Sequence, residues 1–287
     1  MKIHRVLITI FLVLSLSACM GIKFTYNNLD WLVPWYVEDF IELTDGQEEL
    51  FEQEFSELWL WHRTTELPKY VESLKRLETD IADKAMTMDK LVAYQDEASD
   101  HYQVTATRVI SEGIDLLSTL TDEQMDEITE IVTEEMADYE ERVLEEDSEE
   151  RIKDRIKRTE QNFRKWIGKL TNKQKGLIEQ WGSSYESLAE YRLAYMKVSR
   201  AAFFEAMEKR SDKEYLKERL LFLTIERDQL HTEEHLEARG RNRDRSKQLT
   251  LAIEASLTKK QRKRLLNRIR NYRESFEELV EEAETSA

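Results

Sequence analysis

The five residues LTDEQ, at positions 120–124, decide how this chain is interpreted, because the pattern Leu-Thr-x-x-Gln occurs three more times. The other copies are LTDGQ at 43–47, LTNKQ at 170–174 and LTKKQ at 257–261. Random placement of 34 Leu, 20 Thr and 11 Gln in 287 residues would give about 0.09 copies, so chance does not explain four. The intervals of 77, 50 and 87 residues are unequal, which excludes a regular solenoid.

Each copy of the phrase predicts the start of a helix. Thr at the N-cap accepts a hydrogen bond from the amide of the third helical residue, and Gln at that position returns one to the N-cap amide. Such a capping box stabilises a helix start by about 1 kcal/mol. In one copy the preceding Leu can pack on the fourth helical residue, Met125; the other three leucines are expected to pack against the preceding helix. The phrase residues are Leu43, Thr44, Gln47, Leu120, Thr121, Gln124, Leu170, Thr171, Gln174, Leu257, Thr258 and Gln261.

Composition indicates that nearly all of the chain is helical. Gly and Pro together number nine, about 3% of the residues where about 12% is usual, and strands and turns need them more than helices do. Apolar residues also recur every three or four positions, as at Ile152, Ile156 and Phe163. We therefore expect an all-α fold, an elongated antiparallel bundle of long helices. The expected helices are 31–43, 45–63, 67–84, 88–119, 122–147, 149–170, 172–209, 212–238 and 243–284, the last restarting at Thr258.

The first residues of the chain indicate export. Lys2 and Arg5 precede an apolar stretch of eleven residues at 6–16, which suits the core of a signal peptide and is too short to span a bilayer. The stretch LSAC at 16–19 resembles the lipobox of bacterial lipoproteins. That resemblance implies that residues 1–18 are a signal peptide and that Cys19 is the lipid attachment site, diacylated on sulfur and acylated, for example with palmitate, on its amine.

The residues after Cys19 complete this interpretation. Met20 stands where many lipoproteins retained at the inner membrane have Asp, so the resemblance points to the periplasmic face of the outer membrane. Residues 19–29 are expected to form a short tether, and residues 30–287 a single elongated helical domain. Cys19 is also the only cysteine, so no disulfide can form within the chain.

Two further resemblances concern families. The repeated phrase resembles the LTxxQ motif of the Spy/CpxP periplasmic helical chaperones, which implies an apolar groove for unfolded clients. The stretches YNNLDWLVPWYVEDFIELTDGQ at 26–47 and WHRTTELPKY at 61–70 resemble an uncharacterised family of bacterial lipoproteins. That second family implies a lipid anchor and a helical fold, and it brings no known activity.

The stretch HTEEH at 231–235 fits the inverted zincin pattern H-x-x-E-H. His231 and His235 would share a helix face, but zinc needs a third ligand and an open position for water. The flanking residues are typical of a solvated helix, so we expect surface histidines and no metal or other cofactor. A zinc-dependent hydrolase using this pair is the alternative.

Aromatic residues gather shortly after the predicted anchor. Trp31, Trp35 and Tyr36 either fasten the first helix to the bundle or lie at the membrane surface, which aromatic side chains favour. Trp59 and the stretch 61–63 are expected to belong to the same packing.

Charge is divided between two blocks. Residues 112–150 carry seventeen acids and one Arg, whereas residues 239–273 carry thirteen Lys and Arg against two acids. Either the two blocks neutralise each other in the fold, or the basic block meets anionic head groups of lipopolysaccharide or phospholipid. The basic patch comprises Arg239, Arg241, Arg243, Arg245, Lys259, Lys260, Arg262, Lys263 and Arg264.

These patterns favour a binding protein over an enzyme. Seven glycines leave little material for phosphate-cradling loops, and the sequence has no P-loop, no G-x-S-x-G and no Cys/His pair suited to nucleophilic catalysis. The expected function is that of an outer-membrane-anchored periplasmic lipoprotein acting as an envelope scaffold or a chaperone-like clamp, with envelope proteins or unfolded clients as partners. A structural spacer between membrane and peptidoglycan is another alternative. Nucleic acid is not an expected partner, because an exported acidic chain does not suit one.

Overall fold

The fold was analysed on a computed structural model, which describes residues 21–38, 40–145 and 147–286. The predicted signal peptide and Cys19 lie outside these residues. The prediction of an all-α bundle of long helices is confirmed, and the described residues contain no strand. The elements are α2 (Gly21–Asn27), α3 (Leu29–Glu38), α4 (Asp45–Trp61), the π-helix η1 (His62–Glu66), α5 (Leu67–Ala82), α6 (Met88–Ser118), α7 (Asp122–Glu145), α8 (Ser148–Ile167), α9 (Asn172–Ser184), α10 (Ala189–Glu208), α11 (Lys213–Ile225), the 3-10 helix η2 (Arg227–Leu230), α12 (Glu233–Ala255) and α13 (Lys259–Ser286).

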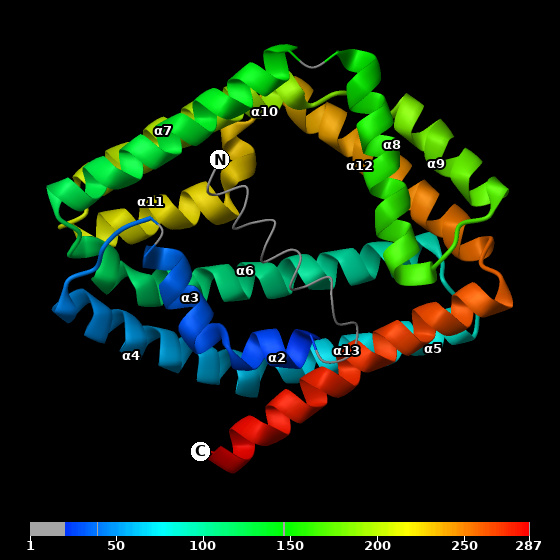
Figure 1. Ribbon diagram of the computed structural model, residues 1–287, viewed down its shortest axis with the longest axis horizontal. Coiled ribbons are helices and arrows are strands. Elements are labelled where there is room, and N and C mark those ends of the chain that lie inside the picture. Colours follow the sequence, from blue (N-terminus) through cyan, green and yellow to red (C-terminus); the bar gives the residue numbers. More distant parts are fainter. Residues whose placement is uncertain (1–20, 39, 146, 287) are drawn as a thin grey trace.

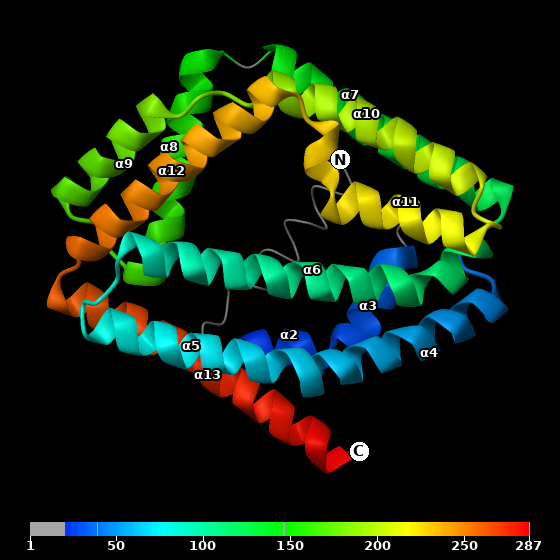
Figure 2. The same ribbon diagram turned by 180° about the vertical axis from the view of Figure 1, so that it is seen from behind.

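The helices follow the sides of a broad triangle (Figure 1). Helices α7 and α10 run along one side, α8, α9 and α12 along the second, and α4, α5, α6 and α13 along the base. The reverse view shows α6 crossing the molecule between α5 and α11 (Figure 2). Among the described helices, none is both long enough and apolar enough to cross a membrane.

Two clusters of buried residues lie at corners of this triangle, and further buried residues such as Leu67 and Leu279 lie between α5 and α13 along the base. One cluster joins helices α6, α7, α10 and α11 through residues that include Ile114, Met207 and Leu216. The other joins α8, α9 and α12 through residues that include Ile178 and Ile253. Each cluster contains one buried leucine of the repeated phrase, so the phrases lie at the corners.

The predicted helix 172–209 is wrong, because the chain breaks between Ser184 and Ala189. Side chains from other helices satisfy the main chain there. The Asn242 side chain accepts from the Glu186 amide and donates to the Glu186 carbonyl, both at 2.9 Å, and Arg155 donates to the Gly182 carbonyl at 3.1 Å. A break stabilised by distant residues gives no local sequence signal.

The predicted helix 212–238 is also wrong. Helix α11 ends at Ile225, and η2 follows. Thr232 then caps α12 by accepting a hydrogen bond from the His235 amide at 3.2 Å, so α12 begins ten residues earlier than the expected 243. The expected restart after Thr258 is confirmed, because α13 begins at Lys259.

The first described helix belongs to the folded body. Residues 21–27 of the predicted tether form α2, which packs against α13. Lys23 Nζ lies 2.6 Å from a carboxylate oxygen of Glu278 and 2.7 Å from one of Glu282. The beginning and end of the described chain are therefore joined.

Close packing of α8 on α9 depends on Gly182. A Cβ at this position would lie 2.3 Å from Cγ1 of Ile156, whereas a Cβ at Gly176 of the same helix would meet nothing within 4 Å. Only a residue without a side chain therefore lets the two helices approach this closely.

We expect Gly182→Ala to lower the free energy of unfolding by about 1–3 kcal/mol, because the new methyl overfills the contact with α8. Gly176→Ala is the matched control and should be neutral or stabilising by up to about 1 kcal/mol, since alanine favours an open helix position. Denaturant unfolding measures both. Equal effects of the two variants would contradict the close contact.

Candidate functional site

The four repeated phrases meet in two pairs, and the contacts between paired glutamines explain the phrase. In the first pair, Gln47 Nε2 donates to Gln124 Oε1 at 3.1 Å, and Gln124 Nε2 donates to Gln47 Oε1 at 2.8 Å. Each Nε2 also donates to the carbonyl of the residue just before the other phrase, namely Thr119 at 3.0 Å and Glu42 at 2.7 Å. We call this arrangement a glutamine clasp.

The second pair repeats the same contacts at the other corner. Gln174 and Gln261 exchange hydrogen bonds of 3.1 and 2.8 Å. Gln174 Nε2 reaches the carbonyl of Ser256 at 3.4 Å, and Gln261 Nε2 reaches that of Lys169 at 2.9 Å. The first clasp thus joins the starts of α4 and α7, and the second joins the starts of α9 and α13.

The capping box and the clasp both use the side-chain amide of the glutamine. Each Gln Oε1 accepts from the amide of its own N-cap Thr, at 2.9–3.0 Å in all four copies. The return bond runs from the backbone amide of each Gln to the Thr hydroxyl. It is 3.2 Å long at Thr121, Thr171 and Thr258. A primary amide has two donors and can accept twice, so each buried glutamine is fully satisfied.

The leucines of the phrases pack beside the clasps. Leu120 is buried in the first core cluster, and Leu43 packs against that cluster. Leu170 is buried in the second cluster, and Leu257 packs against it. Sequence reasoning found the helix starts but not the pairing, since nothing local indicates which glutamine meets which.

A basic groove lies beside the second clasp. It has a volume of about 940 Å³, between the turn that joins α8 to α9 and the start of α13. Its charged lining residues are all cations: Lys169, Lys260, Lys263, Arg264 and Arg268. Three of these five, Lys260, Lys263 and Arg264, belong to the predicted basic patch.

The rest of the predicted basic patch is largely neutralised. Arg239 pairs with Asp228 at 2.6 Å, and Arg262 pairs with Glu254 at 2.6 Å. Arg241 and Arg245 both bind Glu186, at 2.8 and 2.7 Å, and these hydrogen bonds lower the pKa of that carboxyl to about 2.

The acidic block of 112–150 does not supply these partners in the described part of the chain, so of the two alternatives the one in which the blocks neutralise each other does not hold there. Glu112 and Glu149 pair within their own helices, with Arg108 and Lys153. The longer-range ion pairs of the block go to α10, α11 and the turn between them, as in the pair of Lys197 with Glu140 and the pair of Lys213 with Asp115. The physical reason is that α7 packs on α10, while α12 packs on α9.

The prediction of surface histidines at 231 and 235 is wrong. His235 is 3% exposed, and its ring stacks on Tyr191 at 5.2 Å. His231 precedes α12, and its ring centroid lies 4.3 Å from that of Tyr195. The centroids of the two imidazole rings are 4.2 Å apart. His231 and His235 are four positions apart, and so are Tyr191 and Tyr195. This shared spacing was the sequence signal that could have indicated that the two pairs pack together.

The histidine contacts differ from those of a zinc centre. Burial lowers the pKa of both imidazoles, and Arg239 lowers both further. Within the described residues, no group of three His, Cys, Asp or Glu side chains is placed to hold a metal ion. The ring contacts of the two histidines join α10 to the start of α12.

The stretch WHRTTELPKY contains η1, which joins α4 to α5 without a break. Pro68 lacks an amide hydrogen for the helical ladder, and a wider π-helical turn absorbs this defect. Arg63, 6% exposed, donates to the Leu279 carbonyl from Nε at 3.0 Å and from a terminal nitrogen at 2.8 Å. This turn thereby fixes α13 to the base of the molecule.

A second set of polar contacts surrounds the same turn. The Tyr26 hydroxyl and His62 Nδ1 share a hydrogen bond of 2.6 Å, and burial raises the pKa of Tyr26 and lowers that of His62. Glu66 is fully buried, with Lys69 at 2.7 Å and His101 Nδ1 at 3.6 Å. The expected packing of Trp59 and 61–63 includes α2, because Tyr26 stacks on Trp59 at 6.2 Å.

The aromatic residues near the N-terminus divide into two groups. Tyr36 contacts Phe40, which packs on the first core cluster. Trp31 and Trp35 are 54% and 41% exposed, and Phe24 of α2 is 58% exposed. We call these three side chains the aromatic face.

Residues 39–236 match a family of unknown function, DUF6279. The chain belongs to this family. The DUF6279 match contains the first clasp, η1 and both histidines, and it ends before the fourth phrase and most of the basic groove. No curated protein and no solved structure gives a significant match to the chain.

We expect Gln174→Leu and Gln261→Leu each to lower the free energy of unfolding by about 2–3 kcal/mol, because each leaves buried partners unsatisfied. The double variant should lose clearly less than the sum, by at least about 0.5 kcal/mol, since both changes break one clasp. Gln47→Leu combined with Gln174→Leu is the control and should be additive, because these residues belong to different clasps. Denaturant unfolding measures all of them. Additivity within the Gln174 and Gln261 pair would contradict the clasp.

The lowered pKa values of His231 and His235 predict a pH dependence of stability. The unfolded chain takes up protons at these residues near pH 6.5, whereas the folded chain resists protonation. Stability should therefore be lost as the pH falls from 7 toward 5. The double variant His231→Gln and His235→Gln should show a shallower loss in denaturant unfolding over this range. Parallel curves for the variant and the original protein would refute this assignment.

Proposed function

We propose that this protein is a lipoprotein of the outer membrane, facing the periplasm, that acts by binding and not by catalysis. Lipid on Cys19 would hold it to the membrane, and the folded helices would serve as a scaffold for envelope partners. The observation that carries the proposal is the aromatic face, which begins five positions after Cys19 in the sequence.

The arrangement of the aromatic face suits a membrane surface. Trp31 and Trp35 are four positions apart in α3 and therefore lie on one face of that helix, and Phe24 is exposed on the preceding helix α2. Tryptophan favours the interface between lipid and water, where its ring is apolar and its N–H remains hydrogen-bonded. Exposure of three large rings on two short helices is explained if lipid covers them.

The distance from the proposed anchor supports the same arrangement. Only Met20 separates Cys19 from the first residue of α2, and two residues of chain span at most about 7 Å. A lipidated Cys19 would therefore hold α2 close to the head groups. The contacts of Lys23 with α13 would then orient the whole molecule relative to the membrane.

A binding role, and not a catalytic one, is supported by buried polar groups that are engaged in hydrogen bonds within the fold. The clasp glutamines satisfy one another, and Arg63 is held by a carbonyl and by Glu282 at 3.2 Å. These groups act within the fold. The burial of the clasp glutamines also gives the LTxxQ phrase a structural role, so a relation to the Spy/CpxP chaperones rests on the motif alone.

We expect the lipidated protein in vesicles that contain brominated phosphatidylcholine to show strong quenching of tryptophan fluorescence. The variant Trp31→Ser with Trp35→Ser should lose most of this quenching, because these rings would lie among the brominated chains. Trp181→Phe is the control, since Trp181 donates to Ser246 within the fold at 3.2 Å, and it should leave the amount of fluorescence lost to the bromines nearly unchanged.

The anchor itself is tested by Cys19→Ala, which should abolish incorporation of labelled palmitate and recovery in the outer-membrane fraction. Continued lipid labelling of this variant would refute the anchor. Quenching that survives the loss of both Trp31 and Trp35 would refute the contact of the aromatic face with lipid.

A further inference from the structure

We propose that the basic groove beside the second clasp binds a phosphate-bearing anion. The inference extends the proposed function, because an anchored binding protein meets phosphate in lipid head groups. It does not depend on the anchor, since the groove is formed by residues 167–172 and 258–271, far from Cys19 in the sequence. Its evidence is a cavity of about 940 Å³ whose charged lining residues are all cationic.

The cations of the groove differ from the other basic residues of the chain. Within the described residues, no carboxylate lies within 4.0 Å of Lys169, Lys260, Lys263 or Arg264. In contrast, Arg239, Arg241, Arg245 and Arg262 of the predicted basic patch are all paired. Like charges that share a groove repel one another, and a bound anion removes that repulsion. The chain has a net charge of −16, so a cluster of cations without carboxylate partners is unusual for its composition.

Two helix starts add to the positive potential. Helices α9 and α13 both begin at the groove, and their caps, Thr171 and Thr258, line it. The capping boxes use the amides of the cap and of the third helical residue. The amides of the first and second helical residues have no partner within a helix, and such groups bind phosphate and carboxylate oxygens.

Arg268 is held ready for a ligand. Its guanidinium lies 5.0 Å from the centre of the Trp166 ring and donates to the Lys165 carbonyl at 2.9 Å. Its Nε is buried and has no hydrogen-bond partner among the described residues. A guanidinium held by the Trp166 ring and by a carbonyl loses little conformational entropy when it binds an oxyanion.

The turn between α8 and α9 shapes the opposite wall of the groove. Gly168 adopts φ +82°, which suits glycine, and a Cβ there would lie 3.2 Å from Cδ of Arg264. The glycine thus permits Arg264 to lie across the turn, beside the start of α9. Two guanidinium groups, three ammonium groups and two helix starts favour a compact anion with several charged oxygens, which a phosphate group provides.

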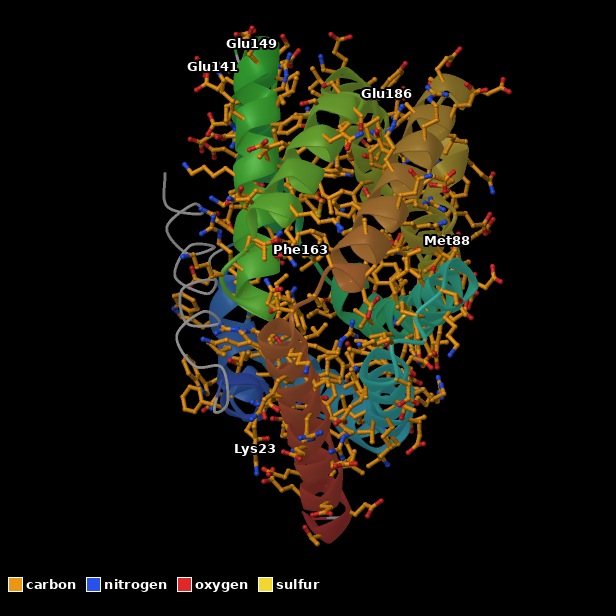
Figure 3. The ribbon with its side chains drawn as sticks, turned by 90° about the vertical axis from the view of Figure 1, so that its right-hand side faces the viewer. Lys23, Met88, Glu141, Glu149, Phe163 and Glu186 are labelled. Atoms are coloured by element: carbon orange, nitrogen blue, oxygen red, sulfur yellow. The ribbon has the colours of Figure 1, made fainter. Side chains whose placement is uncertain are left out.

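The position of the groove is compatible with either a lipid head group or a soluble phosphate ester. Figure 3 shows α8, with Phe163 labelled, along the same edge of the molecule as the N-terminal helices near Lys23. The experiment therefore needs one arm for each source of phosphate.

The test uses the full-length lipidated protein in a neutral detergent. Calorimetry measures binding of glycerol phosphate in one arm, and of micelles that contain phosphatidylglycerol or phosphatidylcholine in the other. The variant Lys260→Gln, Lys263→Gln and Arg264→Gln should bind the phosphate source at least about tenfold more weakly, because three charge-assisted contacts are lost. The matched variant Lys153→Gln, Lys157→Gln and Lys217→Gln removes the same charge outside the groove and should bind nearly as the original does.

The outcomes separate the sources and decide the proposal. Binding in the glycerol phosphate arm that depends on the groove supports a soluble ester, and groove-dependent binding to phosphatidylglycerol micelles alone supports a lipid head group. No binding in either arm overturns the proposal, as does binding that the two triple variants weaken equally. None of these results requires contact of the aromatic face with lipid, so failure here leaves the membrane proposal standing on its own test.

Discussion

The fold depends on pairs of buried primary amides that hydrogen-bond to each other. A glutamine that caps its own helix would ordinarily leave its two N–H groups to solvent, but here both are used by a helix more than seventy residues away in sequence. One side chain therefore both caps its own helix and bonds to the start of a helix that is distant in the sequence. Because the same geometry occurs twice, both core clusters are organised around the same contact.

The two clasps have similar interiors and different surroundings. At the first clasp, Arg210 donates to the Leu120 carbonyl at 2.6 Å and binds Asp122, so the corner is electrically balanced. At the second clasp, the phrases themselves read LTNKQ and LTKKQ, and lysines stand where the first pair has Asp and Glu. Of these phrase lysines only Lys260 lines the groove; the other four groove cations flank the phrases or lie further along α13, so the basic character of the second corner comes mainly from residues outside the repeated phrase.

Sequence reasoning succeeded where structure is decided locally and failed where it is decided at a distance. The helix starts after Thr44, Thr121, Thr171 and Thr258 follow from the capping box, and each was predicted correctly. The break before Ala189 was missed because Asn242 and Arg155 create it from other helices. The histidine pair was placed on the surface because its flanks are charged, while Tyr191 and Tyr195, which cover it, lie forty residues earlier.

The union of α2 with α13 has a mechanical consequence. If the chain is held at its beginning, a pull on that end passes through Lys23 into Glu278 and Glu282, and from there along the last helix to Arg63 and the base of the molecule. Tyr26 passes part of the same pull to His62 of η1, so the load is shared between α13 and the turn that joins α4 to α5. Tension on α2 would have to break the contacts of Lys23 with Glu278 and Glu282 at the same time. Contacts loaded together in this way resist a larger force than contacts that break one after another.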